Sequence, residues 1–256
     1  MSLDGKIVFI TGASAGIGAA TALAFAAEGA RLLLAARRAG KLAEVASLAL
    51  ERGSPAVHSI DLDVRDRRAV QNAIDTLPPD WAEIDVLVNN AGLSRGLDRL
   101  YMGKIDDWDE MIDTNVKGLL YVTRAVVPGM VVRRQGHIVN LGSTAGEVTY
   151  PSGAVYCATK AAEHALNDGL RQDLLGTPVR VTSIDPGMVQ TDFSLIRFHG
   201  DEERAANVYK GITPLTPEDV AEAIVWAVAR PPHVNIARVV LTSINQANSL
   251  LFHRQN

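Results

Sequence analysis

Two side chains four residues apart, Tyr156 and Lys160, have the chemistry to move a proton together. They lie at the start of a segment with helical periodicity, so their spacing places the phenol and the ammonium on one face. A phenol ordinarily ionises near pH ~10, and a neighbouring ammonium favours the phenolate. The pair therefore predicts general acid and base chemistry at Tyr156, although alone it is more often an ordinary surface pair.

Two further polar residues are candidates for the same centre. Ser143 follows an apolar run that ends at Leu141, and its hydroxyl is suited to holding a substrate oxygen beside the phenol. Asn115 lies in a long helical pattern where asparagine is a poor helix former, so we expect its amide to hold a water that relays protons to Lys160. A structural role for Asn115 is equally compatible with the sequence.

A glycine-rich turn, Thr11–Gly18, joins the first apolar run to an alanine-rich helical pattern. Glycine permits a tight turn and lets the backbone approach a pyrophosphate, which then rests on the helix N-terminus. The turn predicts dinucleotide binding by Gly12, Ser14, Gly16, Ile17 and Gly18; the competing reading is a glycine turn that serves packing alone.

The residues after the second apolar run indicate which dinucleotide is used. An NAD enzyme of this fold places a carboxylate there for the ribose 2′-hydroxyl, but this chain has Ala36 followed by Arg37 and Arg38. A guanidinium matches the additional 2′-phosphate of NADP in charge and geometry. The sequence predicts NADP, against the alternative that both arginines are solvated residues at a helix start.

The elements that must position these residues alternate between short apolar runs and longer amphipathic stretches, as in a Rossmann-type doubly wound α/β sheet with helices on both faces. We expect a single domain, residues 1–256, with polar motifs at the carboxyl ends of the strands, where such sheets bind ligands. The seven expected parallel strands are Lys6–Ile10, Arg31–Ala35, Ala56–Ile60, Ile84–Val88, His137–Leu141, Val179–Ile184 and Arg238–Thr242.

Composition narrows the class of protein. The net charge of −4 comes from 25 basic and 29 acidic residues without long runs, which argues against a nucleic-acid partner. No uncharged apolar stretch has the length of a membrane span, and the single cysteine, Cys157, is consistent with a cytoplasmic location. Cys157 is expected to be a packed thiol rather than a nucleophile, and the scattered histidines predict no metal site.

The glycine turn and the group of Ser143, Tyr156 and Lys160 give the chain a resemblance to the short-chain dehydrogenase/reductase family, and this resemblance extends over its whole length. The resemblance implies a catalytic tetrad of Asn115, Ser143, Tyr156 and Lys160, with adenine contacted by Asp63 and a stabilising loop that begins at Asn90. The remaining residues implied for the cofactor follow the third, fourth and sixth strands: Val64, Ala91, Gly92, Pro186, Gly187, Val189 and Thr191.

Four short segments resemble the NADP-dependent 3-hydroxy acid and serine dehydrogenase branch, which also reduces semialdehydes: Leu34–Arg38, Asp192–Gly200, Asn245–Ala247 and His253–Gln255. One departure concerns the substrate: relatives often carry a basic residue near the position of Glu147. A glutamate would repel a substrate carboxylate, so either Arg197 binds that group or the substrate is neutral or cationic.

That departure leaves open a carbonyl reductase for bulkier ketones, quinones or amino ketones. A separate alternative is a regulatory NADP-binding protein without turnover, against which the intact Ser143, Tyr156 and Lys160 argue. The substrate residues expected are Ser143, Glu147, Tyr156, Gln190 and Arg197, the last two within an irregular segment at about 188–217 that we interpret as a substrate lid.

Assembly is the last expectation. The helical patterns Ile105–Val131 and Ala154–Leu175 carry more apolar positions than one sheet face can cover, and the chain ends in the apolar cluster Leu250–Phe252. The resemblance implies a homotetramer of two-fold symmetry with a four-helix interface and a C-terminal tail that reaches a neighbouring subunit's lid.

Overall fold

The computed structural model describes residues 2–255 and contains one sheet of seven parallel strands in the order β3-β2-β1-β4-β5-β6-β7. This confirms the doubly wound α/β prediction, and each expected strand is present to within about two residues at its ends. The strands are β1 (Ile7–Thr11), β2 (Arg31–Ala36), β3 (Val57–Asp61), β4 (Val86–Asn89), β5 (Gly136–Leu141), β6 (Val179–Pro186) and β7 (Arg238–Leu241).

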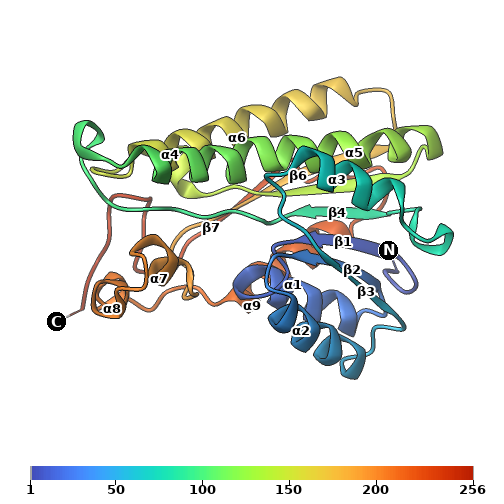
Figure 1. Cartoon of the computed structure of the whole chain (residues 1–256), viewed down its shortest axis with the longest axis horizontal. Coiled ribbons are helices and arrows are strands. Elements are labelled where there is room, and N and C mark those ends of the chain that lie inside the picture. The colour runs from blue at the N-terminus through green and yellow to red at the C-terminus, as the bar shows by residue number, and fades with distance from the viewer. Residues whose placement is uncertain (1, 256) are drawn as a thin grey trace.

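Helices cover both faces of the sheet, as Figure 1 shows: α3, α4, α5 and α6 lie on one side and α1, α2 and α9 on the other. Helices α7 and α8 lie apart from both layers, beyond one edge of the strands. The helices are α1 (Gly16–Ala27), α2 (Ala39–Glu51), α3 (Arg67–Asp75), α4 (Ile105–Ile112), α5 (Leu119–Arg133), α6 (Ala154–Asp173), α7 (Phe193–Arg197), α8 (Glu202–Tyr209) and α9 (Pro217–Val228).

Each face of the sheet has its own hydrophobic core. Ile10 and Phe25 belong to the core between the sheet and the layer of α1, α2 and α9, whereas Phe9 and Met130 belong to the core on the opposite face. Neighbouring residues of a strand point to opposite faces, so a strand buried on both sides is an unbroken apolar run. All five residues of β1 are buried, which explains why the central strands could be located from the sequence.

One expected helix is interrupted. The pattern Ile105–Val131 forms α4 and α5, with a π-helical segment, Asp113–Gly118, between them. Asn115 lies in this segment, and a π-helical turn often marks a functional position because it inserts a residue and redirects side chains. The regular spacing of apolar residues did not reveal the interruption.

The segment from Met188 to Pro217 contains α7 and α8, and the C-terminal tail packs against it within the same chain. The Arg254 guanidinium donates to the carbonyl oxygens of Val208 and Lys210, and the Gln255 amide donates to Gly211 O at 2.8 Å. In the described chain the tail contacts this segment of its own chain, and the expected contact with a neighbouring subunit stays a prediction. Within residues 2–255, no helix combines the length and apolar character needed to cross a membrane.

Candidate active site

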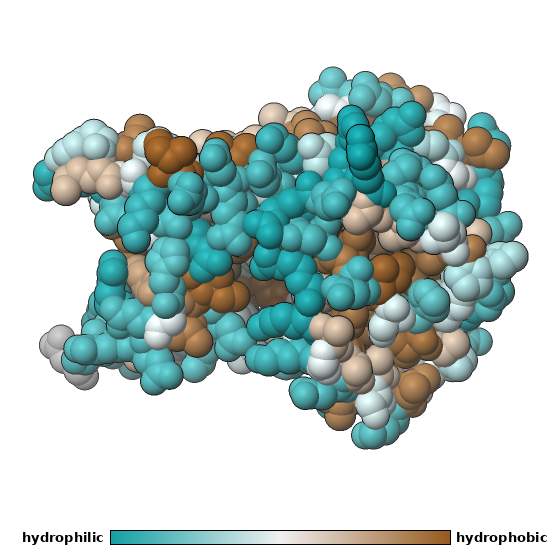
Figure 2. Space-filling model, in the orientation of Figure 1, coloured by the Kyte–Doolittle hydropathy of each residue, from teal (hydrophilic) through white to brown (hydrophobic). Residues whose placement is uncertain are grey.

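A cavity of about 420 Å³ opens at the carboxyl edge of the strands, where the strand order reverses between β1 and β4. Figure 2 shows a hollow on this face between the upper helical layer and the part of the chain that bears α7 and α8. Nearly all residues predicted for the cofactor line this cavity: Gly12, Ser14, Gly16, Ile17, Arg37, Arg38, Asp63, Val64, Asn90, Ala91, Gly92, Tyr156, Lys160, Pro186, Gly187, Val189 and Thr191.

The glycine turn is held in place by Asn90. Its amide nitrogen donates to Thr11 O at 2.8 Å and to Gly12 O at 3.2 Å. Gly12 has a φ of +65°, and a Cβ there would lie 2.9 Å from Ala91 Cα. Gly18 does not line the cavity; a side chain there would overlap the Asn90 amide, so this glycine permits the close approach of two segments rather than contact with a ligand.

The two arginines after β2 occupy one end of the cavity. Arg38 Nε donates to the Ser14 hydroxyl at 3.2 Å, which joins this end to the glycine turn. Arg37 Nη1 lies 3.9 Å from carboxylate oxygens of both Asp63 and Glu110, with half of its side chain exposed. The arrangement leaves a guanidinium beside the cavity, paired only at long range and available to an anion.

Asp63 lines the same end of the cavity, but its carboxylate is already engaged. Arg65 binds it through Nε at 3.0 Å and Nη2 at 2.6 Å, and the Arg65 backbone amide donates to it as well. Burial would raise the pKa of Asp63, but the hydrogen bonds and charge of Arg65 outweigh that effect and hold the pKa below its usual value. The expected adenine contact must therefore share this carboxylate with Arg65.

Three residues of the predicted catalytic group surround the other end of the cavity. Tyr156 lies in the first turn of α6, Lys160 one turn later, and Ser143 directly after β5; all three are buried and line the cavity. The Ser143 hydroxyl accepts a hydrogen bond from the Ala145 amide at 3.1 Å and lies 3.4 Å from Pro186 O. A hydroxyl, a phenol and an ammonium thus share one pocket.

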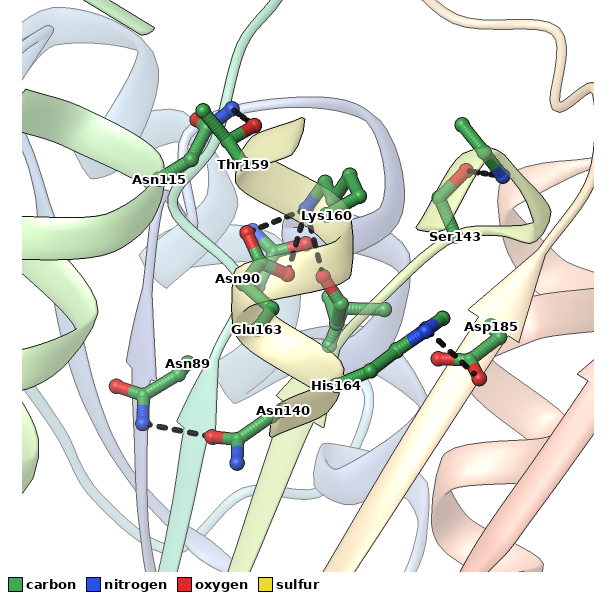
Figure 3. A network of polar contacts seen from close by, with 12 residues as sticks. Asn89, Asn90, Asn115, Asn140, Ser143, Thr159, Lys160, Glu163, His164 and Asp185 are labelled. Carbon is green, nitrogen blue, oxygen red and sulfur yellow. Dashed lines mark hydrogen bonds and ion pairs between the residues drawn. The ribbon is translucent and has the colours of Figure 1, made fainter. Parts of the chain in front are cut away.

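Asn115 lies beside this group, and its side chain forms hydrogen bonds with Leu93 and Thr159. The amide oxygen accepts from Leu93 N at 2.9 Å, and the amide nitrogen donates to Leu93 O at 2.8 Å and Thr159 Oγ1 at 3.0 Å. Figure 3 shows the contact with Thr159 on α6. These hydrogen bonds clamp the segment after β4 against α6, and the expected water at Asn115 stays a prediction.

Lys160 has an unexpected partner. Its ammonium donates to Leu141 O at 2.8 Å and lies 2.9 Å from each carboxylate oxygen of Glu163, one turn further along α6. Figure 3 shows the two side chains pointing toward each other on the inner face of the helix. Burial alone would lower the pKa of Lys160, but the adjacent Glu163 charge outweighs burial and raises it. The ammonium stays charged although it is buried.

The segment that bears α7 closes over the phenol. The Arg197 guanidinium carbon lies 5.3 Å from the Tyr156 ring centre and 4.9 Å from that of Phe193, and Nη2 donates to the Tyr150 hydroxyl at 2.9 Å. The main chain is tied to the loop after β4, because Gly96 N donates to Arg197 O at 2.8 Å. A positive charge is thus fixed beside the Tyr156 ring, while the role of this segment as a substrate lid stays a prediction.

Three of the expected substrate residues, Glu147, Gln190 and Arg197, are not among the residues that line the cavity, although the Arg197 guanidinium lies beside the Tyr156 ring. Glu147 is not among the cavity residues; its carboxylate pairs with Arg238 Nη1 at 2.6 Å, and Arg238 also pairs with the buried Asp185. Gln190 is exposed, and its backbone amide donates to Leu215 O at 2.8 Å. Neither the Glu147 nor the Gln190 side chain lines the cavity, because closeness in sequence to Ser143 or to the irregular segment did not determine which way they point; their roles toward a substrate stay predictions.

Cys157 follows the catalytic tyrosine but is buried, and burial raises the pKa of its thiol. A thiol that ionises less readily is a poor nucleophile, in keeping with the expected packing role. Among residues 2–255, no cluster of three or more histidine, cysteine or acidic side chains has a metal-binding arrangement.

Four residues near the cavity were not predicted: Arg95, Glu110, Phe193 and Glu163. Arg95 joins the lid to α4, since its guanidinium donates to Ile196 O at 2.6 Å and to Glu110 at 2.7 Å. Arg95, Glu110 and Phe193 come together only through tertiary packing. Glu163 had a detectable signal, because a residue three positions after Lys160 in a helix lies on the same face.

Comparison with known proteins agrees with this geometry. The family model described as short chain dehydrogenase matches residues 6–199. The NADP-dependent 3-hydroxy acid dehydrogenase YdfG of Salmonella typhi is 48% identical over 242 residues, covering 94% of this chain and 96% of the relative. The NADP-dependent 3-hydroxy acid dehydrogenase of Schizosaccharomyces pombe is 43% identical over 254 residues, covering 99% and 98%.

Two solved structures extend the comparison. The closed form of serine dehydrogenase complexed with NADP+ superposes with a TM-score of 0.90 at 45% identity, covering 97% of this chain and 100% of that one. Serine dehydrogenase from Escherichia coli gives a TM-score of 0.81 at 42% identity, with coverages of 94% and 99%. The match of sequence, fold and cavity residues over nearly the whole length means that this chain belongs to the short-chain dehydrogenase family.

Proposed function

We propose that the protein is an NADP-dependent dehydrogenase that interconverts small 3-hydroxy acids, serine among them, and the corresponding carbonyl acids. The observation that carries the proposal is the position of the Arg197 guanidinium over the Tyr156 ring, at 5.3 Å from its centre. A cation beside the proton-transferring phenol suits a substrate whose hydroxyl and carboxylate are separated by a few atoms. The named relatives act on substrates of this kind.

The cavity suits NADP at both ends. Gly12 and Gly16 have positive φ and leave room for a pyrophosphate at the N-terminus of α1, while Arg37 and Arg38 border the end where a 2′-phosphate would bind. Pro186, Gly187, Val189 and Thr191 border the opposite end, toward Tyr156, and suit the nicotinamide. Bound NADP supplies the hydride acceptor or donor.

The residues of the chain then divide the remaining chemistry. Tyr156 exchanges the proton of the substrate hydroxyl, and Lys160 supplies the positive charge that favours the phenolate. Ser143 holds the reacting oxygen through its hydroxyl, which the Ala145 amide orients at 3.1 Å. Asn115 fixes the segment after β4 against α6 and so keeps the cavity wall in register with Lys160.

The substrate carboxylate is assigned to Arg197. Two of its nitrogen atoms donate to Ser94 Oγ at 3.0 Å and Tyr150 at 2.9 Å, which orients the guanidinium while leaving further N–H groups for a ligand. The repulsion expected from Glu147 is weakened because Arg238 neutralises that carboxylate outside the cavity. This removes the main argument for a bulky neutral ketone as substrate.

The test is reduction of NADP+, followed at 340 nm, with 3-hydroxypropanoate, L-serine and the neutral analogue 1,3-propanediol. We expect turnover of the two acids and a kcat/KM at least about 10-fold lower for the diol, since one charge-assisted contact is worth roughly 1.5–3 kcal/mol. Equal activity on the diol would contradict the assignment of a carboxylate site. Faster reduction of bulky ketones or quinones would favour the carbonyl reductase instead.

We also propose a homotetramer in the cytoplasm. The outer face of α5 exposes apolar side chains, including Leu120 at 41% and Val132 at 83%, and Leu251 near the C-terminus is 59% exposed. Self-complementary helix faces favour closed two-fold assemblies. Light scattering at micromolar concentration is expected to give a mass near four times 27.4 kDa, and a monomer mass would contradict the proposal.

A further inference from the structure

The pairing of Lys160 with Glu163 has a consequence for the chemistry at Tyr156. Lys160 Nζ is held from two sides, by Leu141 O at the end of β5 and by both oxygens of Glu163. An ammonium has three N–H groups, and these three acceptors suffice to occupy all of them. The cation is therefore fixed in position by a carbonyl oxygen and a carboxylate, and it lies 6.0 Å from the centre of the Tyr156 ring.

Glu163 also reduces the effective positive charge of Lys160, because the two side chains carry opposite charges. The side chains of Lys160 and Glu163 are 8% and 3% exposed, so water screens neither of them appreciably. A full negative charge 2.9 Å from the ammonium cancels much of the field that the ammonium alone would exert on a phenolate. The phenol then experiences a dipole rather than an isolated positive charge, and its ionised form is favoured less strongly.

Other charges around Glu163 are compensated among themselves. Asp185 on β6 is fully buried, but it pairs with His164 Nε2 at 3.2 Å and with Arg238 on β7. Figure 3 shows His164 and Asp185 on the other side of α6 from Asn115. The titratable or charged groups that face the pair from all packed elements are Tyr156 and His164 on α6 and Asp185 on β6, with Arg238 and Glu147 behind Asp185.

We propose that Glu163 is a positioning residue that acts through Lys160 and sets the pH range in which Tyr156 exchanges its proton. The inference rests on the proposed roles of Tyr156 and Lys160 and adds one residue to them. Glu163 fixes the ammonium and reduces its effective charge at the phenol, so the enzyme works in a more alkaline range than an unpaired lysine would allow. Burial raises the pKa of Glu163 above its usual value, and the adjacent Lys160 charge opposes that effect and favours the carboxylate.

The experiment is a pH profile of kcat/KM for NADP+ reduction with 3-hydroxypropanoate, because that parameter reports the ionisations of the free enzyme. Glu163→Gln keeps the shape and one acceptor but removes the charge. We expect the midpoint of the acidic limb to move to lower pH by about 0.5–1 unit, as removal of a nearby buried charge implies. Asp168→Asn, an exposed carboxylate on the same helix, is the matched control and should leave the midpoint unchanged.

An unchanged midpoint, or a shift to higher pH, in a folded Glu163→Gln variant overturns the inference, and loss of thermal stability alone indicates a structural role. If that variant does not fold, Glu163→Asp replaces it; the shorter carboxylate should give a smaller shift to lower pH, and no shift overturns the inference. Tyr156→Phe is measured in parallel. Near-normal turnover in Tyr156→Phe refutes the proposed function, whereas an inactive Tyr156→Phe with an unmoved Glu163→Gln profile refutes only the role of Glu163.

Discussion

The two ends of the cavity hold their charges in opposite ways. At the end bordered by Arg37, Asp63 and Glu110, the side chains are 50%, 31% and 21% exposed and Arg37 lies 3.9 Å from each carboxylate. At the catalytic end, Lys160 and Glu163 are almost completely buried and in contact at 2.9 Å. Exposed ion pairs at long range contribute little to the stability of the fold and are weakened by salt. Removing one partner of a buried ion pair, in contrast, lowers the free energy of unfolding by several kcal/mol.

This difference suits the two tasks. The exposed end has to exchange its internal ion pairs for a doubly charged phosphate each time a cofactor binds, so weak pairs are an advantage. The catalytic end has to keep one charge at one place through the proton transfer, and a desolvated pair with fixed partners does so. Substitutions at the catalytic end should therefore change rate strongly, and those at the exposed end should change affinity moderately and depend on salt.

The largest expected effect is at the catalytic end. Tyr156→Phe removes the proton donor and keeps the ring, so kcat should fall by at least about 100-fold, the usual effect of losing a general acid. NADPH binding, followed by fluorescence, should change little because the ring still packs against Phe193 at 5.5 Å. Tyr101→Phe removes a hydroxyl from a tyrosine that is 77% exposed and should leave kcat unchanged. A comparable loss in both variants would contradict a special role for Tyr156.

The next effect is at the exposed end. Arg37→Asp replaces the guanidinium with a group that repels a 2′-phosphate and accepts from a 2′-hydroxyl, so the NADP+ to NAD+ ratio of kcat/KM should fall by about 10- to 100-fold. Arg52→Asp makes the same charge change at the far end of α2 and serves as control. A ratio that moves equally in both variants would show that net charge, and not the contact, determines cofactor choice.

A smaller effect is expected in the lid. Arg197→Ala should raise KM for 3-hydroxypropanoate about 10-fold, the value of one charge-assisted contact, and leave KM for 1,3-propanediol nearly unchanged. Arg204→Ala, the control, removes another arginine of the same segment, which stacks 4.4 Å over Phe198 instead of over Tyr156. If both substrates lose affinity equally in Arg197→Ala, the residue closes the lid and does not bind the carboxylate.

The smallest effect should depend on salt. Glu110→Gln removes a charge that lies 3.9 Å from Arg37 and 2.7 Å from Arg95, so KM for NADP+ should fall about 2- to 3-fold at low ionic strength. Near 0.5 M salt, where the Debye length is only about 4 Å, most of the difference should vanish. Asp109→Asn, the exposed neighbour on α4, is the control. An effect that persists in high salt would mean that Glu110 acts through packing.

The parts of the fold that the sequence predicted well share a physical cause. Strands buried on both faces must be unbroken apolar runs, so β1 and β4 could be located to within about two residues. Tyr156 and Lys160 were recognisable because their contact is local to one helix. The cavity position followed from parallel topology, which brings the carboxyl ends of all strands to one edge.

The side-chain positions that the sequence did not predict depend on tertiary contacts. Glu147 and Gln190 were assigned from their neighbours in the chain, but a side chain's direction depends on tertiary partners, here Arg238 for Glu147. Asn115 was placed near the centre correctly, yet the π-helical turn that aims its amide at Leu93 has no signature in the spacing of apolar residues. Arg95 lies in the loop after β4 and Glu110 on α4, and the two side chains meet only in the folded chain. The spacing of apolar residues cannot predict such a contact.

The tail that packs on the lid bears on how the protein can be handled at the bench. Arg254 and Gln255 bond to Val208 at the end of α8 and to Lys210 and Gly211 directly after it, so anything fused behind them is attached to the segment that we expect to cover the substrate. The first described residues lie before the amino end of β1, at the sheet edge opposite the cavity, and Figure 1 marks the two ends on different sides of the molecule. A purification tag or a surface tether placed at the N-terminus leaves the lid free, whereas the same group at the C-terminus pulls on it.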